Sequence, residues 1–390
     1  MTAARPLRVC YFGTYRADYN RNRILREALR QNGVIVYECH VRLWRDIEDR
    51  VQVVSGGWRR PTFWWRVWRA YATLLWRYWQ IPDHDIVIVG YPGQLDVFPA
   101  RLVSWLRRKP LVWDILMSLY LVASERGLER YSRLGVELLR PLEWAACRLP
   151  DLLILDTPDY VGWFHRAYGI DPSRFRLVPI GADDHIFQPP STSSSVPRHQ
   201  FCVVYYGTFI TNHGVRYIVE AARLLQHEED IHFELIGEGP ERPLVEELAR
   251  RYGLANITFI NWLEPRALVR RLADAAVCLG VFGATTQSLL TIHNKIYEGL
   301  AMRRAVISGD SPAMRRVFIP GHHLYLVPRA DAAELAQAIR TLKADSALSA
   351  TLANAGYSLY RQRFTPGHLG RLYRRYLLAL LRGKSSSPRK

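Results

Sequence analysis

The sequence predicts an α/β protein built from two doubly wound domains in tandem. Short apolar, strand-like runs alternate with amphipathic segments along the 390-residue chain, a pattern typical of βαβ units and parallel sheets. A chain of this length is also too long for one ordinary hydrophobic core. The alternation stops once, at the Pro/Ser-rich stretch "QPPSTSSSVPRHQ" of residues 188–200, and then restarts, which indicates a linker between two domains.

The strands are predicted from short runs of β-branched, aromatic and aliphatic residues. In the first half these runs cover 8–15, 33–41, 85–91, 110–118, 151–157 and 175–181, with helices expected at 22–31 and 158–168 among the segments between them. In the second half they cover 201–209, 231–237, 257–262, 277–283, 305–309 and 324–328. We therefore expect a first domain over 1–187, a linker over 188–200, a second domain over 201–366, and a C-terminal helix with a basic tail over 367–390.

Charge and cysteine usage narrow the class of protein. The formal net charge is +17, which points to phosphate groups in nucleic acid, anionic lipid or a nucleotide. No zinc-finger, RNP or basic-zipper pattern accompanies the charge, so nucleic acid is not expected as a partner.

The scattered cysteines sit mostly in apolar runs, as buried thiols in a reducing cytosol do. The N-terminus lacks the apolar stretch of a signal peptide, and no apolar run is long enough to span a membrane, so we expect a cytoplasmic protein.

Two strand ends in the second half carry glycine. The stretch "YYGTFITNHGV" places Gly207, Thr208 and His213 between a strand and a helix, where converging backbone N–H groups can cradle a phosphate. A plain βα turn is the alternative. The stretch "IGEGPER" adds Gly237 and Glu238 after the next strand, which is a weak indication by itself.

A third strand end carries a cation and a carboxylate. In "TIHNKIYEGLAM", residues 291–302, Lys295 and Glu298 are three residues apart, so they should share one face of the first turns of a helix. Such a pair is often only a solvated surface pair.

The order and spacing of these segments resemble the C-terminal domain of group 1 (family four) retaining glycosyltransferases. The stretch "RLVPIGADDHIFQP" before the linker is similar to that family's Val-Pro-Asn-Gly-Val-Asp segment, with Ile180 in the Asn position. In the first half, "YPGQLDVFPARL" and "PLVWDILMSLY" are similar to a membrane-associated branch of the family. The resemblance implies the GT-B fold, in which two Rossmann-like domains face each other across an interdomain cleft.

The resemblance also implies roles for the strand-end residues. In the family this segment ends in Glu-x7-Glu, and the second Glu binds the ribose hydroxyls of the nucleotide sugar. Glu298 matches the second position, whereas Leu290 stands at the first, and Thr208 and His213 replace the family's diphosphate-binding Arg and Lys. The implied donor-binding residues are Gly207, Thr208, Gly237, Glu238, Asn294 and Glu298, with His213 and Lys295 as catalytic residues.

The expected chemistry needs positive charge at this site. Breaking a sugar–phosphate bond leaves a nucleoside diphosphate with growing negative charge. We expect Lys295, His213, Thr208 and helix N-terminal amides to meet that charge. No DxD dyad stands in a suitable loop, because "ADD" at 182–184 lies between the domains. The sequence therefore predicts a metal-independent reaction without a cofactor, in which the nucleotide sugar is a co-substrate.

The first domain is expected to hold the acceptor. Gly13 and Thr14 end its first strand and should face the cleft, with Arg16 close behind. Asp114 ends the strand in "PLVWD", where the similar branch carries an acidic residue. It is predicted to be a third catalytic residue that orients an acceptor hydroxyl; a helix N-cap is the alternative.

Residues 58–81, "WRRPTFWWRVWRAYATLLWRYWQI", hold six of the twelve tryptophans. On a helix, Arg66 and Arg69 fall in a narrow stripe among aromatic and aliphatic residues, which favours a helix lying in a lipid interface. We therefore predict that Trp64, Trp65, Trp68, Arg66 and Arg69 contact an anionic membrane surface, the inner face of the plasma membrane. A helix packed on its own sheet is the alternative.

The leading prediction is a peripheral, cytoplasmic enzyme that transfers a sugar, with retention, from a nucleotide donor to a lipid-linked or polysaccharide acceptor. The second is a non-catalytic GT-B scaffold that binds nucleotide sugar or glycan, favoured by Leu290 and by the Thr208 and His213 replacements. A nucleotide-sugar epimerase on the same fold fits poorly, because the motifs of 170–320 resemble transferases more closely.

Overall fold

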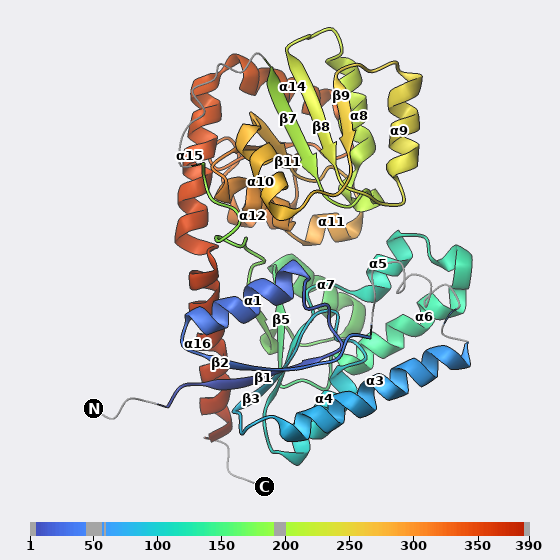
Figure 1. The fold of residues 1–390 in the computed structure, drawn as a ribbon, viewed down its shortest axis with the longest axis vertical. Coiled ribbons are helices and arrows are strands. Elements are labelled where there is room, and N and C mark those ends of the chain that lie inside the picture. Colours follow the sequence, from blue (N-terminus) through green and yellow to red (C-terminus); the bar gives the residue numbers. More distant parts are fainter. Residues whose placement is uncertain (1–4, 44–56, 58–59, 191–199, 386–390) are drawn as a thin grey trace. The chain divides into compact units, whose positions relative to one another are not determined.

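A computed structural model describes residues 5–43, 57, 60–190 and 200–385 of the chain. The chain divides into two compact units, Met1–Pro179 with Pro366–Lys390 and Ile180–Thr365. Figure 1 shows the elements of both units, and each unit is described by itself.

The described part of the first unit holds a 6-stranded parallel sheet in the order β2-β1-β3-β4-β5-β6. Its strands are β1 (Arg8–Gly13), β2 (Ile35–His40), β3 (Ile86–Val89), β4 (Leu111–Asp114), β5 (Leu152–Leu155) and β6 (Phe175–Leu177). The central strands β3, β4 and β5 are buried at every position, as expected of a parallel sheet with helices on both faces.

The described part of the first unit also holds helices, some of which begin at a side-chain cap. They are α1 (Asn20–Gln31), α3 (Pro61–Gln80), α4 (Val97–Leu106), α5 (Leu119–Glu125), α6 (Glu129–Ala146), α7 (Pro158–Tyr168), the 3₁₀ turn η2 (Pro172–Arg174) and α16 (Pro366–Ser385). Helix α7 illustrates the local rules: the side chain of Thr157 accepts a hydrogen bond from the Tyr160 N–H, Pro158 takes the first helical position, and Gly169 ends the helix at φ 65.

The second unit repeats this architecture within its described residues. Its 6-stranded sheet has the order β12-β11-β10-β7-β8-β9. The strands are β7 (Phe201–Tyr206), β8 (Ile231–Ile236), β9 (Ile257–Ile260), β10 (Val277–Leu279), β11 (Ala305–Gly309) and β12 (Tyr325–Val327). The helices are η3 (Thr211–His213), α8 (Val215–Leu224), α9 (Arg242–Arg251), α10 (Pro265–Asp274), α11 (Thr286–Leu290), α12 (Asn294–Ala301), α13 (Pro312–Val317), α14 (Ala332–Ala344) and α15 (Ser346–Arg363).

Each predicted strand range contains a strand of the structure, so the predicted class of two Rossmann-like α/β domains is confirmed. The predicted boundaries differ from the observed division at residues 180–187 and at the C-terminal helix, which belongs to the first unit. Residues 180–187 belong to the second unit rather than the first, because Ala182 and Phe187 are buried there and Tyr360 donates to the Ala182 carbonyl over 3.2 Å. Most of the predicted linker, 191–199, lies outside the described residues.

The C-terminal helix is part of the first unit and not a separate element. In Figure 1, α16 runs beside α1. Its residues Leu369, Tyr373 and Leu377 join the same hydrophobic core as the residues of α1 and β1. The sequence could not assign this helix to a unit, since its partner helix lies at the other end of the chain.

Gly370 is a point of close contact between α16 and α1, and it yields a first prediction. A Cβ at Gly370 would collide with the Ala28 carbonyl, whereas a Cβ at Gly383 would meet nothing within 4 Å. Gly370→Ala should therefore lower the free energy of unfolding by about 1–3 kcal/mol, the usual effect of overpacking. Gly383→Ala, on the same helix, should cause no loss. Urea unfolding measures both, and equal stability of the two variants would contradict the packing described here.

Candidate functional site

The carboxyl edge of the second sheet is held together by close contacts at glycine. Gly207 follows β7 with φ +139, and a Cβ there would lie 2.8 Å from the Lys295 Nζ. Gly237 follows β8 with φ +132, and a Cβ there would collide with the Gly207 carbonyl. Both conformations favour glycine. These two predicted donor-binding residues thus let the loops after β7 and β8 lie against each other and let Lys295 reach the end of β7.

Lys295 is buried at this edge, in the first turn of α12, with 3% of its surface exposed. Its Nζ lies 4.0 Å from the centroid of the Tyr205 ring and 3.4 Å from the His213 Nδ1. Burial lowers the pKa of Lys295 to about 7, although the Glu298 carboxylate acts in the opposite direction. The side chain is therefore close to its titration point near neutral pH.

His213 is fixed by the loop that follows β7. Its Nδ1 lies 2.6 Å from the Thr208 carbonyl oxygen and 2.9 Å from the Tyr205 hydroxyl. A carbonyl only accepts hydrogen bonds, so Nδ1 carries the proton in this contact. Thr208 contributes its backbone carbonyl here. The predicted residues His213, Thr208 and Lys295 are thus brought together.

Glu298 lies one turn after Lys295 and is 1% exposed. Its carboxylate accepts hydrogen bonds from the Tyr206 hydroxyl over 2.6 Å and from the Asn294 side-chain amide over 3.0 Å. The alternative of a solvated surface pair for Lys295 and Glu298 is therefore wrong, because both side chains are buried. The predicted donor-binding residues Asn294 and Glu298 form one hydrogen-bonded group.

Glu238 differs from these residues because its side chain is 46% exposed and forms an ion pair of 2.8 Å with Arg242. The Glu238 backbone carbonyl accepts from the Phe209 N–H over 2.9 Å, which joins the loops after β7 and β8. Glu238 is thus near the site but is engaged in a local pair.

Two basic residues at this edge were missed in the sequence analysis. Arg329 follows β12, and its guanidinium donates to the Asp310 carbonyl over 2.6 Å and to the Gly283 carbonyl over 2.8 Å. Burial lowers the pKa of Arg329 to about 10. The ring of His293 lies 5.2 Å from that of His213, between centroids, and burial together with Lys295 and Arg329 holds the His293 pKa well below its usual range. Arg329 directly follows the predicted strand 324–328, so attention to every strand end would have found it.

At the corresponding edge of the first sheet, the predicted acceptor residues surround a carboxylate that the sequence analysis also missed. Asp96 is 2% exposed and accepts hydrogen bonds from the Thr14 N–H over 2.7 Å and the Thr14 hydroxyl over 2.8 Å. A Cβ at Gly13 would lie 2.5 Å from the Asp96 Oδ2. The absence of a side chain at Gly13 therefore leaves room for the Asp96 carboxylate. Arg16 forms an exposed ion pair of 2.8 Å with Asp18.

Asp114 does not occupy the position predicted for a catalytic residue. It is fully buried and forms a bidentate pair with Arg21, with an Nη2–Oδ1 distance of 2.8 Å and an Nε–Oδ2 distance of 2.9 Å. Burial opposes the charge of Arg21, but the Asp114 carboxylate outweighs it and raises the Arg21 pKa. The N-cap alternative is also wrong, since Ser118 caps the following helix α5. We assign Asp114 a positioning role, because Arg21 also donates to the carbonyls of Val178 and Pro179.

The tryptophan helix α3 turns its aromatic face outward. Trp64, Trp65 and Trp68 are 52%, 64% and 60% exposed, whereas Phe63, Val67, Ala70, Leu74 and Tyr78 are buried. Arg69 is exposed and Arg66 is half-buried. Across the described residues, no helix is both long and apolar enough to cross a membrane. The core alternative therefore fails for these three tryptophans; Trp58 lies outside the described residues.

The part of the chain that the structure describes contains no cluster of three or more His, Cys, Asp or Glu side chains that could hold a metal ion.

Comparison with known proteins identifies the class of the second unit. Residues 200–345 match the family model described as "Glycosyl transferases group 1". The match covers most of the second unit and agrees with the resemblance to group 1 glycosyltransferases inferred from the sequence.

Two characterised relatives match the chain over part of their length. It is 27% identical over 170 residues to the lipopolysaccharide core biosynthesis glycosyltransferase LpsD of Rhizobium meliloti, which covers 43% of this chain and 47% of that protein. It is 27% identical over 165 residues to the alpha-D-kanosaminyltransferase of Streptomyces kanamyceticus, which covers 40% of this chain and 42% of that protein. The match thus spans less than half the length of either relative.

Solved structures extend the similarity of fold to both units. A sucrose-phosphate synthase from Thermosynechococcus elongatus has a TM-score of 0.72 at 18% identity, covering 96% of this chain and 100% of that one. The Anabaena protein Alr3699/HepE in complex with UDP-glucose has a TM-score of 0.68 at 15% identity, covering 96% of this chain and 99% of that one. The chain therefore has two Rossmann-like domains of the GT-B type.

The depressed pKa of Lys295 predicts a pH-dependent stability. Between pH 7 and the ordinary lysine pKa of 10.5 the unfolded chain binds more protons at this residue than the folded chain. The free energy of unfolding should therefore rise with pH in this window. Relative to Lys295→Met, wild type should gain about 2 kcal/mol between pH 7 and pH 9, measured by urea unfolding at both values.

Lys343→Met is the matched control. Hydrogen bonding to Asp230 and Glu228 raises the pKa of Lys343, so that residue is protonated in both states throughout the window and its loss should leave the slope unchanged. Parallel profiles for wild type and Lys295→Met would contradict the assignment of a depressed pKa to Lys295.

Proposed function

We propose that this protein is a retaining, metal-independent glycosyltransferase that moves a sugar from a nucleoside diphosphate sugar to a lipid-linked or polysaccharide acceptor at a membrane surface. One observation carries the proposal: four basic side chains converge at the carboxyl edge of the second sheet, close to the Glu298 carboxylate. They are Lys295, His213, His293 and Arg329. A concentration of buried and half-buried basic groups is suited to an anion, because its negative charge favours their protonated forms.

The chemistry uses charge that these side chains supply. As the sugar–phosphate bond breaks, negative charge grows on the departing diphosphate, and contacts that strengthen with that charge lower the barrier. Arg329 carries its charge throughout the neutral range, since its pKa is about 10. Lys295 gains a full charge when a phosphate approaches, because an anion raises the pKa of a nearby ammonium. Retention and independence of metal are proposed from the resemblance and from this set of cations.

Glu298 is proposed to bind the ribose of the donor. Tyr206 and Asn294 fix the orientation of its carboxylate, and a carboxylate can accept about four hydrogen bonds in all. The Anabaena protein was solved with UDP and with UDP-glucose, so a uridine diphosphate sugar is the first donor to test.

The acceptor is proposed to be reached from a membrane surface, at the cytoplasmic inner face of the plasma membrane. Besides the three tryptophans above, Trp76 and Trp79 of α3 are 62% and 54% exposed. Trp and Tyr side chains favour the headgroup region, and Arg beside them favours anionic lipid. Helix α4 adds Trp105 at 71% exposure, and Arg107, which follows α4, lies over the Trp79 ring at 5.1 Å.

A non-catalytic scaffold is the second candidate. Leu290 is a buried apolar residue of α11. It stands at the position of the family's first Glu, so that position supplies no carboxylate. Release of nucleoside diphosphate from donor in the presence of membrane extract separates the two candidates. An enzyme releases it, whereas a scaffold binds the donor and leaves it intact.

Removing the Glu298 charge should weaken donor binding. Glu298→Gln should raise the Kd for UDP-glucose by about tenfold or more, because a hydrogen bond to a charged group contributes about 1.5–3 kcal/mol. Isothermal titration calorimetry with UDP and UDP-glucose measures the change. Glu247→Gln, which alters an exposed pair with Arg251 on α9, is the matched control and should bind as wild type does. Wild-type affinity in Glu298→Gln would contradict the ribose assignment.

The metal-independent mechanism predicts that activity persists in EDTA. Loss of activity in EDTA, with rescue by magnesium or manganese, would contradict that mechanism.

The exposed tryptophans predict reversible binding to anionic vesicles. Sedimentation with vesicles should fall as salt rises, since the Debye length shrinks to about 3 Å at 1 M, yet a part should persist because burial of aromatic rings is not screened. The combined change of Trp64, Trp65 and Trp68 to Ser should reduce binding further. Trp262→Ser, a 54% exposed tryptophan of the second unit, is the control. Failure of wild type to sediment with vesicles at low salt would rule out the membrane contact.

A further inference from the structure

Several polar contacts tie α3 to the rest of the first unit, and two of them concern one loop, while the outer side of the helix carries the exposed tryptophans. From the middle of the helix, the Tyr71 hydroxyl donates to the Asp96 carboxylate over 2.8 Å. From its last turn, the Arg77 guanidinium donates to the His40 carbonyl over 2.6 Å. Both contacts lead to the segment of residues 14–19, which joins β1 to α1 and which we call the β1 loop.

The first contact reaches the start of the β1 loop through Asp96. The carboxylate that accepts from Tyr71 also accepts from the N–H and the hydroxyl of Thr14. Burial raises the pKa of Asp96, and the hydrogen bonds from Thr14 and Tyr71 oppose that change. Loss of the Tyr71 hydroxyl would therefore remove one of the donors that keep a buried carboxylate ionised and in place.

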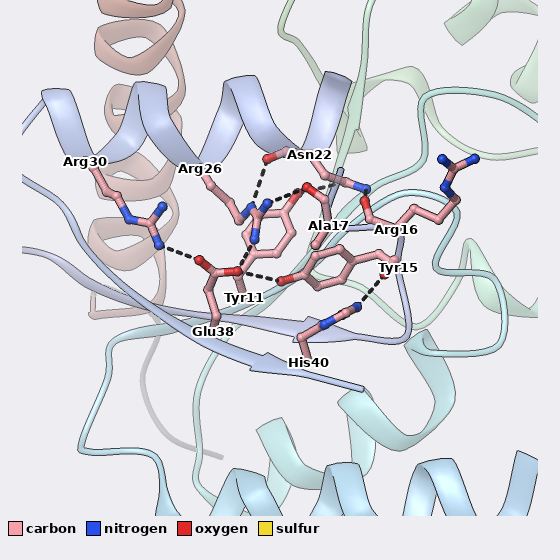
Figure 2. Close-up of polar contacts among 9 residues, drawn as sticks. All are labelled: Tyr11, Tyr15, Arg16, Ala17, Asn22, Arg26, Arg30, Glu38 and His40. Atoms are coloured by element: carbon pink, nitrogen blue, oxygen red, sulfur yellow. Dashed lines mark hydrogen bonds and ion pairs between the residues drawn. The ribbon is translucent and has the colours of Figure 1, made fainter. Parts of the chain in front are cut away.

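The second contact continues to the next residue of the loop through His40, whose side chain contacts Tyr15 in Figure 2. The His40 Nε2 lies 2.5 Å from the Tyr15 carbonyl and donates to it, because a carbonyl only accepts. The rest of the loop is held by α1: Asn22 donates to the Arg16 carbonyl over 2.9 Å, and Arg26 donates to the Ala17 carbonyl over 2.6 Å. The start of the loop thus depends on α3 and its end on α1.

We propose that Tyr71 and Arg77 are positioning residues that couple contact of α3 with an anionic lipid surface to the order of the β1 loop. The coupling rests on the proposed function, which places α3 on the membrane, and on the acceptor site that the sequence predicts at Gly13, Thr14 and Arg16. A lipid surface that holds α3 in one orientation strengthens both links, and the loop then presents Thr14 and Arg16 in a single arrangement. The β1 loop would then be ordered only while the protein is on the membrane that carries the acceptor.

Hydrogen–deuterium exchange on the full chain tests the first link. In wild type, vesicles of phosphatidylcholine with 30 mol% phosphatidylglycerol, at saturating concentration, should slow exchange of the Thr14 amide, which donates to Asp96, by about tenfold. Tyr71→Phe should sediment with the vesicles as wild type does and show less than a twofold slowing. Tyr131→Phe, an exposed tyrosine of α6, is the control and should behave as wild type.

A pair of arginine variants tests the second link. Arg69→Met and Arg77→Met remove one exposed positive charge each from α3 and should weaken vesicle binding to a similar degree. Only Arg77 donates to His40, so at saturating lipid Arg77→Met alone should lose the slowed exchange of the β1 loop. This comparison separates the coupling from the loss of charge.

Vesicle binding and amide exchange together separate the coupling from the membrane contact. Slowed exchange in wild type that is absent in Tyr71→Phe and Arg77→Met supports the coupling. Normal vesicle binding with the same exchange in wild type and Tyr71→Phe overturns the coupling and leaves the proposed membrane contact intact. Absence of vesicle binding by wild type overturns both, and donor binding to the second unit, measured separately with UDP-glucose, remains as the test of the transferase assignment.

Discussion

The buried ammonium of Lys295 is the interaction on which the rest of the second unit's site depends. An ammonium removed from water carries a large desolvation cost unless other groups replace its hydration. Here the face of the Tyr205 ring lies 4.0 Å away and supplies cation–π attraction. Gly207 leaves room for the ammonium, because a Cβ would lie 2.8 Å from it. One cation, the Lys295 ammonium, therefore accounts for the arrangement around it: the end of β7, Gly207 and the loop that holds His213.

This arrangement also explains how several basic groups can coexist at one edge of the sheet. Burial lowers the pKa values of Lys295 and Arg329, and burial together with those two side chains lowers the pKa of His293. Lys295 and His293 therefore carry less charge near neutral pH than their number suggests. The family's permanent Arg and Lys are Thr208 and His213 in this chain, so a larger share of the charge is proposed to develop only when an anion binds.

The sequence could predict those parts of the structure that depend on local pattern. Strand ranges, helices α1 and α7, and the outward face of α3 follow from periodicity and capping, and all are present. The resemblance predicted that Lys295 and Glu298 belong to one site, whereas the burial of both side chains was not predicted from the sequence. Asp114 was assigned wrongly because its partner Arg21 is 93 residues away, and no local pattern pairs the two. The same limit hid Asp96, whose partners Thr14 and Tyr71 come from two distant elements.

The fate of the acceptor proton follows from the way these carboxylates are used. Asp96 is engaged by Thr14 and Tyr71, and Asp114 by Arg21, so neither is placed to act as a base without first giving up a buried contact. An acceptor hydroxyl must still lose its proton as the new glycosidic bond forms. A departing diphosphate oxygen gains negative charge, and hence basicity, at the same moment. We therefore expect the leaving group to take the proton, while Lys295 and Arg329 keep that oxygen from becoming basic too early.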